Sequence, residues 1–137
     1  MKSRKAAAAT SSPRTGSAVQ GAVRMQAFEE GVQRAVVDHL RWRHVPGLVW
    51  GHPANGGARS KSAAGRLKAM GVVAGLPDLL LWHGGKSYGL ELKANAGRVS
   101  DEQRSMLQRL TLAGMYVAVA FEVDEAVGQL ETWGLLR

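Results

Sequence analysis

The hydrophobic positions of residues 25–43 recur at the spacing of an α-helix. Val32, Val36 and Leu40 follow one another at intervals of four residues, with polar residues between them. This period places the three side chains on one face and predicts an amphipathic helix. Extended toward the N-terminus, the apolar stripe reaches Glu29. A carboxylate there either points inward with the stripe or complements the helix dipole from the first turn, and the pattern leaves both interpretations open.

Two apolar runs on either side of Gly84-Gly85 predict a β-hairpin. Residues 79–82 and 87–93 are typical of strands, and a glycine pair between two such runs is a strong turn signal. Residues 48–50 fit a further short strand upstream. Residues 58–74 fit either a loop or a short helix, and their pattern does not decide between the two.

The C-terminal third of the chain predicts a helix, a strand and a second helix. Ser100 to Gln103 has the S-x-x-Q form of a capping box, and Gly114 is placed to end the helix that begins there. Residues 115–121 are typical of a buried strand, and residues 124–133 of a closing helix. The order α-β-β-β-α-β-α predicts an α/β fold with a mixed sheet flanked by helices.

Length and composition exclude several classes of protein. The chain has 137 residues, of which 45% are hydrophobic, enough for one domain with its own core. Its longest apolar run is too short to span a bilayer, so we expect no membrane protein. The absence of cysteine excludes disulfides, thiolate nucleophiles and cysteine-ligated metal sites, and it fits a cytoplasmic protein.

The charge of the chain is unevenly distributed. Lys and Arg number 18 against 11 Asp and Glu, a net charge of +7 that predicts a polyanionic partner. Five of the basic residues lie in residues 1–24, which contain no acid and are rich in Ala, Ser, Gly and Thr. Such a segment cannot build a core. We therefore predict a disordered basic arm over residues 1–24 and a single domain over residues 25–137.

Asp78, Glu91 and Lys93 are predicted to converge at one end of the hairpin. With the two glycines at the turn, Trp82 faces Ser87 and, at the end of the ladder, Asp78 faces Glu91. Side chains paired in this way lie about 4.5–5.5 Å apart at Cβ, and Lys93 shares the face of Glu91. One interpretation is an ion pair at a solvent-exposed edge, which contributes little. The other is a pair of oxygen ligands for a divalent cation such as Mg²⁺, beside a lysine that acts on the nucleophile or on developing charge.

Several short segments around this cluster occur in an informative order. A helix with E-x-x-x-Q, from Glu29 to Gln33, precedes GLPDLLLW, the Gly-Gly turn and GLELK, and GRVSDEQ follows. HPANGG and RLKAMG lie upstream, and LAGMYVAVA and LETWGLL lie downstream. Together these segments, over about residues 28–136, resemble the VRR-NUC branch of the PD-(D/E)xK nuclease superfamily. They are most similar to its small stand-alone members from phages and bacteria.

The resemblance implies a restriction-endonuclease-like fold and metal-dependent hydrolysis of phosphodiester bonds. By position in the motifs, Asp78, Glu91 and the backbone carbonyl of Leu92 bind Mg²⁺ or Mn²⁺. Lys93 assists the nucleophilic water, and Glu29 acts directly or through metal-bound water. The family members imply a homodimer that acts on branched or junction DNA in a bacterial cell or a phage-infected host.

Further residues have two interpretations each. Gln103 matches the family's glutamine after E-x-K, but it fits equally well as the capping partner of Ser100. Between Asp38 and Asp78 the chain contains no acid. Cations there would hold a DNA backbone without reading bases, although any single one of them is also typical of an ordinary solvated surface. The candidate phosphate contacts are Arg59, Lys61, Arg66 and Lys68, with Asn55, primarily a turn residue, at the border of the site.

Three functions follow from these patterns, and they make different predictions. The first is a structure-selective, metal-dependent DNA endonuclease, which requires the carboxylate and lysine cluster. The second is a non-catalytic DNA-binding or junction-binding protein with a vestigial metal site. The third is a structural protein in which the E-x-K strand is incidental, with no metal binding and no preference for nucleic acid.

Overall fold

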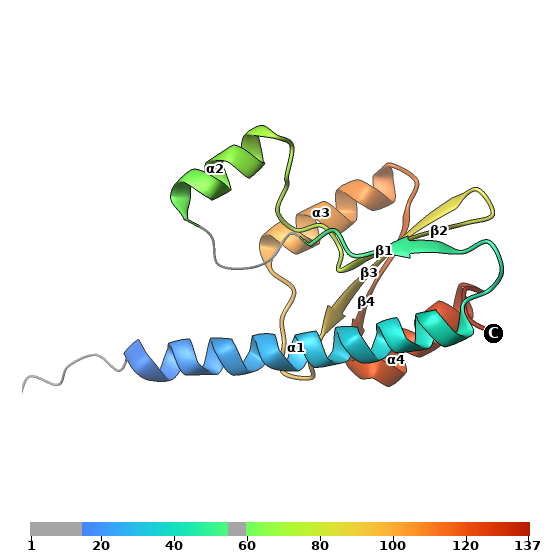
Figure 1. The fold of residues 1–137 in the computed structure, drawn as a ribbon, viewed down its shortest axis with the longest axis horizontal. Coiled ribbons are helices and arrows are strands. Elements are labelled where there is room, and N and C mark those ends of the chain that lie inside the picture. The colour runs from blue at the N-terminus through green and yellow to red at the C-terminus, as the bar shows by residue number, and fades with distance from the viewer. Residues whose placement is uncertain (1–14, 55–59) are drawn as a thin grey trace, which may run out of the picture.

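Four strands form one mixed sheet in the computed structural model, which describes residues 15–54 and 60–137 (Figure 1). The strands lie in the order β1-β2-β3-β4. The pairs β1–β2 and β2–β3 are antiparallel, and β3–β4 is parallel, so the predicted mixed sheet is confirmed. The strands are β1 (Val49–Gly51), β2 (Leu79–His83), β3 (Lys86–Lys93) and β4 (Tyr116–Phe121).

The β2–β3 hairpin has the predicted register. Trp82 pairs with Ser87, and the remaining partners of the two strands follow the same offset. Gly84 and Gly85 have φ angles of 56° and 76°. A two-residue turn that matches the strand twist needs positive φ at both positions, which glycine adopts without strain. The turn chemistry therefore determines which residues of the two strands face each other.

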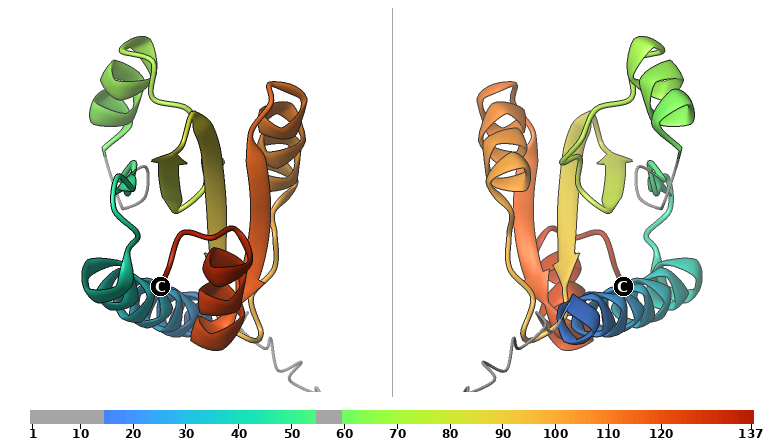
Figure 2. Two further views of the ribbon diagram at one scale, coloured as in Figure 1. Left: turned by 90° about the vertical axis from the view of Figure 1, so that its right-hand side faces the viewer. Right: turned by 90° about the vertical axis from the view of Figure 1, so that its left-hand side faces the viewer.

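Helices cover both faces of the sheet (Figure 2). α1 and α4 lie side by side and contact each other and β3, whereas α3 contacts β4. α3 also makes the crossover between the parallel strands β3 and β4, which a tight turn cannot join. α2 occupies part of the segment that the sequence left undecided, so the order is α-β-α-β-β-α-β-α. The helices are α1 (Thr15–Arg43), α2 (Lys61–Ala69), α3 (Asp101–Leu112) and α4 (Glu122–Thr132).

The core lies between the sheet and the pair α1 and α4. The α1 stripe that the sequence predicted is buried there, including Val36 and Leu40 at 0% exposure. On β3, Tyr88, Leu90 and Leu92 belong to the same cluster. Because successive residues of a strand point to opposite faces, the alternate positions of β3 face away from this core. Those positions carry the charged residues of the candidate site.

α1 begins ten residues earlier than the predicted domain. It starts at Thr15, so the prediction of a disordered arm is wrong for residues 15–24, and residues 1–14 lie outside the described part. Val19 and Val23 are 63% and 61% exposed, which agrees with a segment that adds nothing to the core. A helix already fixed by core contacts extends without the cost of a new nucleus, and composition alone does not show this. None of the described helices is long and apolar enough to cross a membrane.

We predict that core leucines, and not exposed ones, determine stability. Leu130→Ala in α4 removes a side chain with 0% exposure, whereas the control Leu112→Ala removes one that is 82% exposed. We expect the first variant to lose about 2–5 kcal/mol of unfolding free energy and the second about 0.5 kcal/mol or less, measured by urea denaturation. Equal losses would contradict the packing of α4 on the sheet.

Candidate active site

Glu91 and Lys93 are the two charged residues that are buried in the described part of the chain. They are 2% and 6% exposed and lie on the face of β3 opposite Leu90 and Leu92. Burying a charge is unfavourable unless the charge is paired or hydrogen-bonded. The partners of these two side chains therefore define the site.

Lys93 lies between two carboxylates from different elements. Its Nζ is 3.5 Å from Glu91 Oε1 and 3.6 Å from Glu29 Oε1. Figure 1 shows why Glu29 reaches it, since the carboxyl end of β3 points at α1. Because α1 begins at Thr15, Glu29 lies in the middle of the helix, and the interpretation as a first-turn acid is wrong. The inward-pointing interpretation of Glu29 is confirmed.

Asp78 directly precedes β2 and faces the same end of β3. The ladder ends at Leu79 and Leu90, and the same register places Asp78 opposite Glu91 as predicted. The backbone N–H of Leu92 donates to Asp78 Oδ2 at 2.8 Å. The N–H and C=O of one strand residue point to the same side of the strand, so the Leu92 carbonyl is also directed to the side of β3 on which Asp78 lies.

Gln103 completes the predicted capping box and also contacts Glu91. Its Oε1 accepts from the backbone N–H of Ser100 at 2.9 Å, and its own N–H donates to the Ser100 hydroxyl, which completes the capping box of α3. Its Nε2 donates to Glu91 Oε1 at 2.6 Å. Each end of the amide has a partner, so the start of α3 fixes the orientation of the Glu91 carboxylate.

The electrostatics of the site favour an additional cation. Burial, and after it the nearby Asp78 carboxylate, raise the pKa of Glu91 to about 8 against the opposing effect of Lys93. When all three acids are ionised, Glu29, Asp78 and Glu91 carry three negative charges against the single positive charge of Lys93. A divalent cation between Asp78 and Glu91 would remove the repulsion that Lys93 leaves in place.

The donor set fits a hard divalent metal. No group of three or more His, Cys, Asp and Glu side chains arranged for a metal exists within residues 15–54 and 60–137. Two carboxylates, from Asp78 and Glu91, and the carbonyl of Leu92 are oxygen donors at one edge of the sheet. Mg²⁺ needs no larger protein cage, because it binds through one or two carboxylates and keeps several waters.

A continuous groove leads past this cluster. Three adjoining cavities of about 680, 360 and 220 Å³ follow α1, Asp78 and the start of α3. The first two share Glu30 and Gln33, and the last two share Asp78. His52 lines all three. Of the acids in the cluster, Glu29 and Asp78 line this groove, whereas Glu91 lines none of the three cavities.

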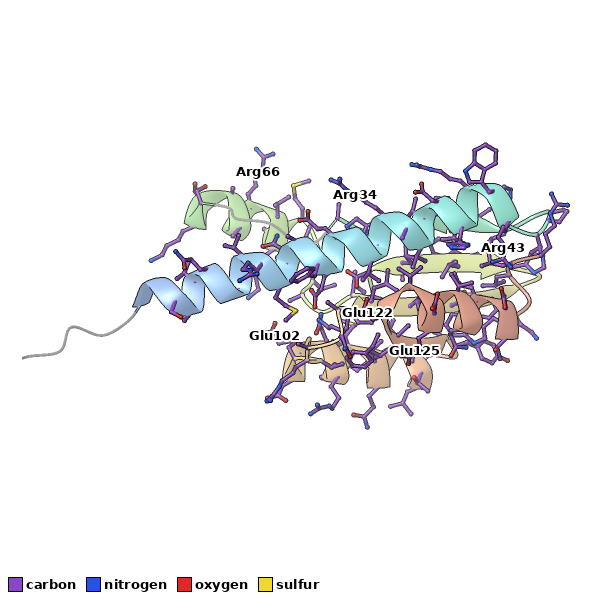
Figure 3. The ribbon with its side chains drawn as sticks, turned by 90° about the horizontal axis from the view of Figure 1, so that it is seen from below. Arg34, Arg43, Arg66, Glu102, Glu122 and Glu125 are labelled. Carbon is purple, nitrogen blue, oxygen red and sulfur yellow. The ribbon has the colours of Figure 1, made fainter. Side chains whose placement is uncertain are left out.

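The predicted phosphate contacts lie on α2. Lys61, Arg66 and Lys68 are exposed, no residue of this helix is buried, and Asn55 and Arg59 lie outside the described residues. Figure 3 shows Arg66 projecting away from α1. The structure brings none of these three cations into the cavities beside Asp78.

Arg34 is a cation of the groove that the sequence did not identify. It is an exposed residue of α1 and lines the cavity of about 680 Å³. In Figure 3 it projects from the side of α1 on which α2 lies. It forms no ion pair with a described residue, whereas Arg43 is held by Glu131 at 2.7 Å. Only the position of α1 on the sheet reveals this role.

Comparisons with known proteins agree with this geometry. The model of the VRR-NUC domain matches residues 28–122, which is more than half of the chain. The chain belongs to the VRR-NUC family. Its fold is similar to that of a solved structure described as a VRR_NUC domain protein, with a TM-score of 0.62, 23% identity, and coverage of 77% of this chain and 87% of that one. Curated proteins give no match to it.

Membership of the VRR-NUC family implies a nuclease of the PD-(D/E)xK type. A nuclease in turn implies a DNA substrate and a divalent metal. The described residues supply what such a site needs, which is an acid directly before β2 and an acid and a lysine on β3.

A close backbone contact shapes this VRR-NUC site, and the sequence analysis did not single it out. A Cβ atom on Gly97 would lie 2.9 Å from Glu29 Oε1 and 3.4 Å from Lys93 Cδ. The turn after β3 therefore approaches the ion pair so closely that only glycine fits without displacement. The signal in the sequence is the glycine of GRVS shortly after E-x-K, and its meaning depends on where α1 crosses the turn.

We predict that Gly97→Ala damages the site more than the fold. The added methyl group displaces the Glu29 carboxylate from Lys93, and we expect cleavage to fall by about 10-fold or more, since small misplacements at a reacting centre are costly. The control is Gly128→Ala in α4, where a Cβ meets nothing within 4 Å. It should keep full activity and gain about 0.5–1 kcal/mol in unfolding free energy. Full activity of Gly97→Ala would contradict the role of this contact.

Proposed function

We propose that this VRR-NUC domain is a Mg²⁺- or Mn²⁺-dependent DNA endonuclease with its active site at Asp78, Glu91 and Lys93. The observation that carries the proposal is the buried Lys93 between Glu29 and Glu91, beside a groove that Glu29 and Asp78 line. Asp78, Glu91 and the Leu92 carbonyl hold the cation in this proposal. A bound divalent cation polarises the phosphoryl group and neutralises charge that develops on it.

Each side chain of the cluster has a separate task in the proposed reaction. Lys93 Nζ lies 3.5–3.6 Å from two carboxylates, which hold its ammonium group in place. From there it donates to the nucleophilic water or to a phosphate oxygen. Glu29 orients Lys93 and the water, and Gln103 fixes the rotamer of Glu91 through its 2.6 Å hydrogen bond. The preorganised charges are thus in position before the substrate arrives.

The substrate side of the proposal is a DNA strand bound through its backbone. The groove passes Asp78 and carries Arg34, and the exposed cations of α2 lie at the surface. Contacts of this kind hold phosphates and do not read bases, which supports selection by DNA structure. Branched or junction DNA, a homodimer with two active sites, and the cytoplasm of a bacterial cell or infected host remain predictions from the family resemblance.

We predict that cleavage requires both the divalent metal and Lys93. Labelled flap, splayed-arm and four-way-junction DNA is incubated with Mg²⁺, Mn²⁺ or EDTA. Lys93→Met keeps the alkyl chain and removes the charge, and we expect kcat to fall about 10²–10³-fold. The control is Lys86→Met, which changes an exposed lysine at the other end of β3 and should leave the rate unchanged. Tight DNA binding without cleavage of any substrate would favour a binding protein with a vestigial metal site. Equal cleavage in EDTA and in Mg²⁺ or Mn²⁺ would contradict the proposal.

We predict that the N-terminal basic residues contribute binding without chemistry. Deleting residues 1–14 removes Lys2, Arg4, Lys5 and Arg14 and leaves α1 whole. Each lost phosphate contact should lower the slope of log Kd against log salt by about 0.9. Fluorescence anisotropy measures the slope, and cleavage at saturating DNA should stay at the rate of the full chain. An unchanged affinity and slope would show that these residues do not contact DNA.

A further inference from the structure

His52 connects the end of β1 to the candidate metal site. β1 pairs with β2 as far as Gly51 and Leu80. The next residue, His52, leaves the ladder, and its Nδ1 lies 2.6 Å from the backbone carbonyl oxygen of Asp78. Continuing this register would place Pro53 opposite Asp78, and proline has no backbone N–H to donate, so the side chain of His52 supplies the donor instead.

The chemistry of the two groups determines the direction of this hydrogen bond. A carbonyl oxygen only accepts, so the hydrogen is on Nδ1 of the imidazole, and Nδ1 donates to Asp78. The ring keeps this role whether or not Nε2 also carries a hydrogen. The contact therefore fixes the Asp78 backbone without depending on the charge of His52.

Asp78 is held from two sides by this arrangement. The N–H of Leu92 on β3 holds its carboxylate at 2.8 Å, and His52 holds its carbonyl at 2.6 Å. Asp78 itself lies one residue outside β2, where the ladder no longer restrains it. Without His52, the Asp78 backbone would lose this restraint, and the position of a residue that must meet Glu91 would depend on the contacts of its carboxylate.

His52 also lies in the groove beside the candidate metal site. Its ring lines each of the three cavities that form the groove. The cavity at Asp78 is also lined by Gln26, Glu29, Glu30, Gln33 and Ala54. A strand of DNA in the groove would pass over the same ring that holds the metal ligand.

We propose that His52 is a positioning residue that places Asp78 for metal binding. This inference rests on the proposed function, because it assigns Asp78 a cation to bind. Residues that orient metal ligands without touching the metal commonly change affinity by about 10–100-fold when they are replaced. His52 acts here through the backbone of the ligand and not through its carboxylate.

The test compares replacements that keep or remove the donor at Nδ1. In His52→Asn the side-chain amide places an N–H near the position of Nδ1, in His52→Gln the amide lies one carbon further out, and His52→Ala removes it. The matched control is His83→Ala, which removes a similar bond, from His83 Nε2 to the carbonyl of Pro46 at 3.2 Å, at the other end of β2.

Two measurements read the position of Asp78 without relying on activity. Calorimetric titration with Mn²⁺ should show about 10–100-fold weaker binding for His52→Ala and His52→Gln, with His52→Asn and His83→Ala close to the original protein. Amide hydrogen exchange of Leu92 in metal-free protein should accelerate in the same two variants, because that amide is bonded to Asp78 Oδ2. If His52 only stabilised the fold, its replacement would lower the melting temperature without producing this pattern of Mn²⁺ affinity and Leu92 exchange.

The outcomes separate the inference from the proposed function. Unchanged Mn²⁺ affinity and unchanged Leu92 exchange in His52→Ala would overturn the positioning role. Failure of His52→Asn to restore either quantity would overturn the assignment to the Nδ1 hydrogen bond. Absence of Mn²⁺ binding in the original protein would contradict the proposed function, and Leu92 exchange would still decide whether His52 positions Asp78.

Discussion

The burial of Lys93 between Glu91 and Glu29 is the constraint on which the rest of the site depends. A lysine at 6% exposure is stable there only because two carboxylates lie within 3.6 Å of its Nζ. One of these acids comes from its own strand and the other from α1, so the pair fixes where the helix crosses the end of the sheet. Gly97 leaves room for that crossing.

The remaining polar contacts restrain the acids from separate elements. Gln103 holds Glu91 from the start of α3, Leu92 holds the Asp78 carboxylate from β3, and His52 holds the Asp78 carbonyl from the end of β1. Positions set by several packed elements are rigid, and rigidity is what a site that stabilises developing charge needs. The excess of negative charge that results is the reason to expect a divalent cation.

The hairpin and its carboxylates could be predicted because local chemistry determines them. Two glycines fix the turn, the turn fixes the register, and the strand period places Glu91 and Lys93 on one face. The start of α1 at Thr15 could not be predicted from the apolar pattern, because a helix that is anchored by core contacts can extend beyond its apolar stripe. Arg34 and Gly97 were not assigned because their roles arise from where distant segments meet. The capping role of Gln103 could be named from the sequence, but only the approach of α3 to β3 shows that the same side chain also bonds to Glu91.

The claim that Asp78 and Glu91 form a cation site is tested most directly by calorimetric titration of Mn²⁺ into the protein and into Glu91→Gln. That substitution keeps the size of the side chain and removes its charge. The account predicts one saturable binding process in the original protein and a loss of about 10-fold or more in affinity in the variant, as expected when a ligand that a cation prefers is removed. Equal binding by both proteins, or no saturable binding by either, would contradict it.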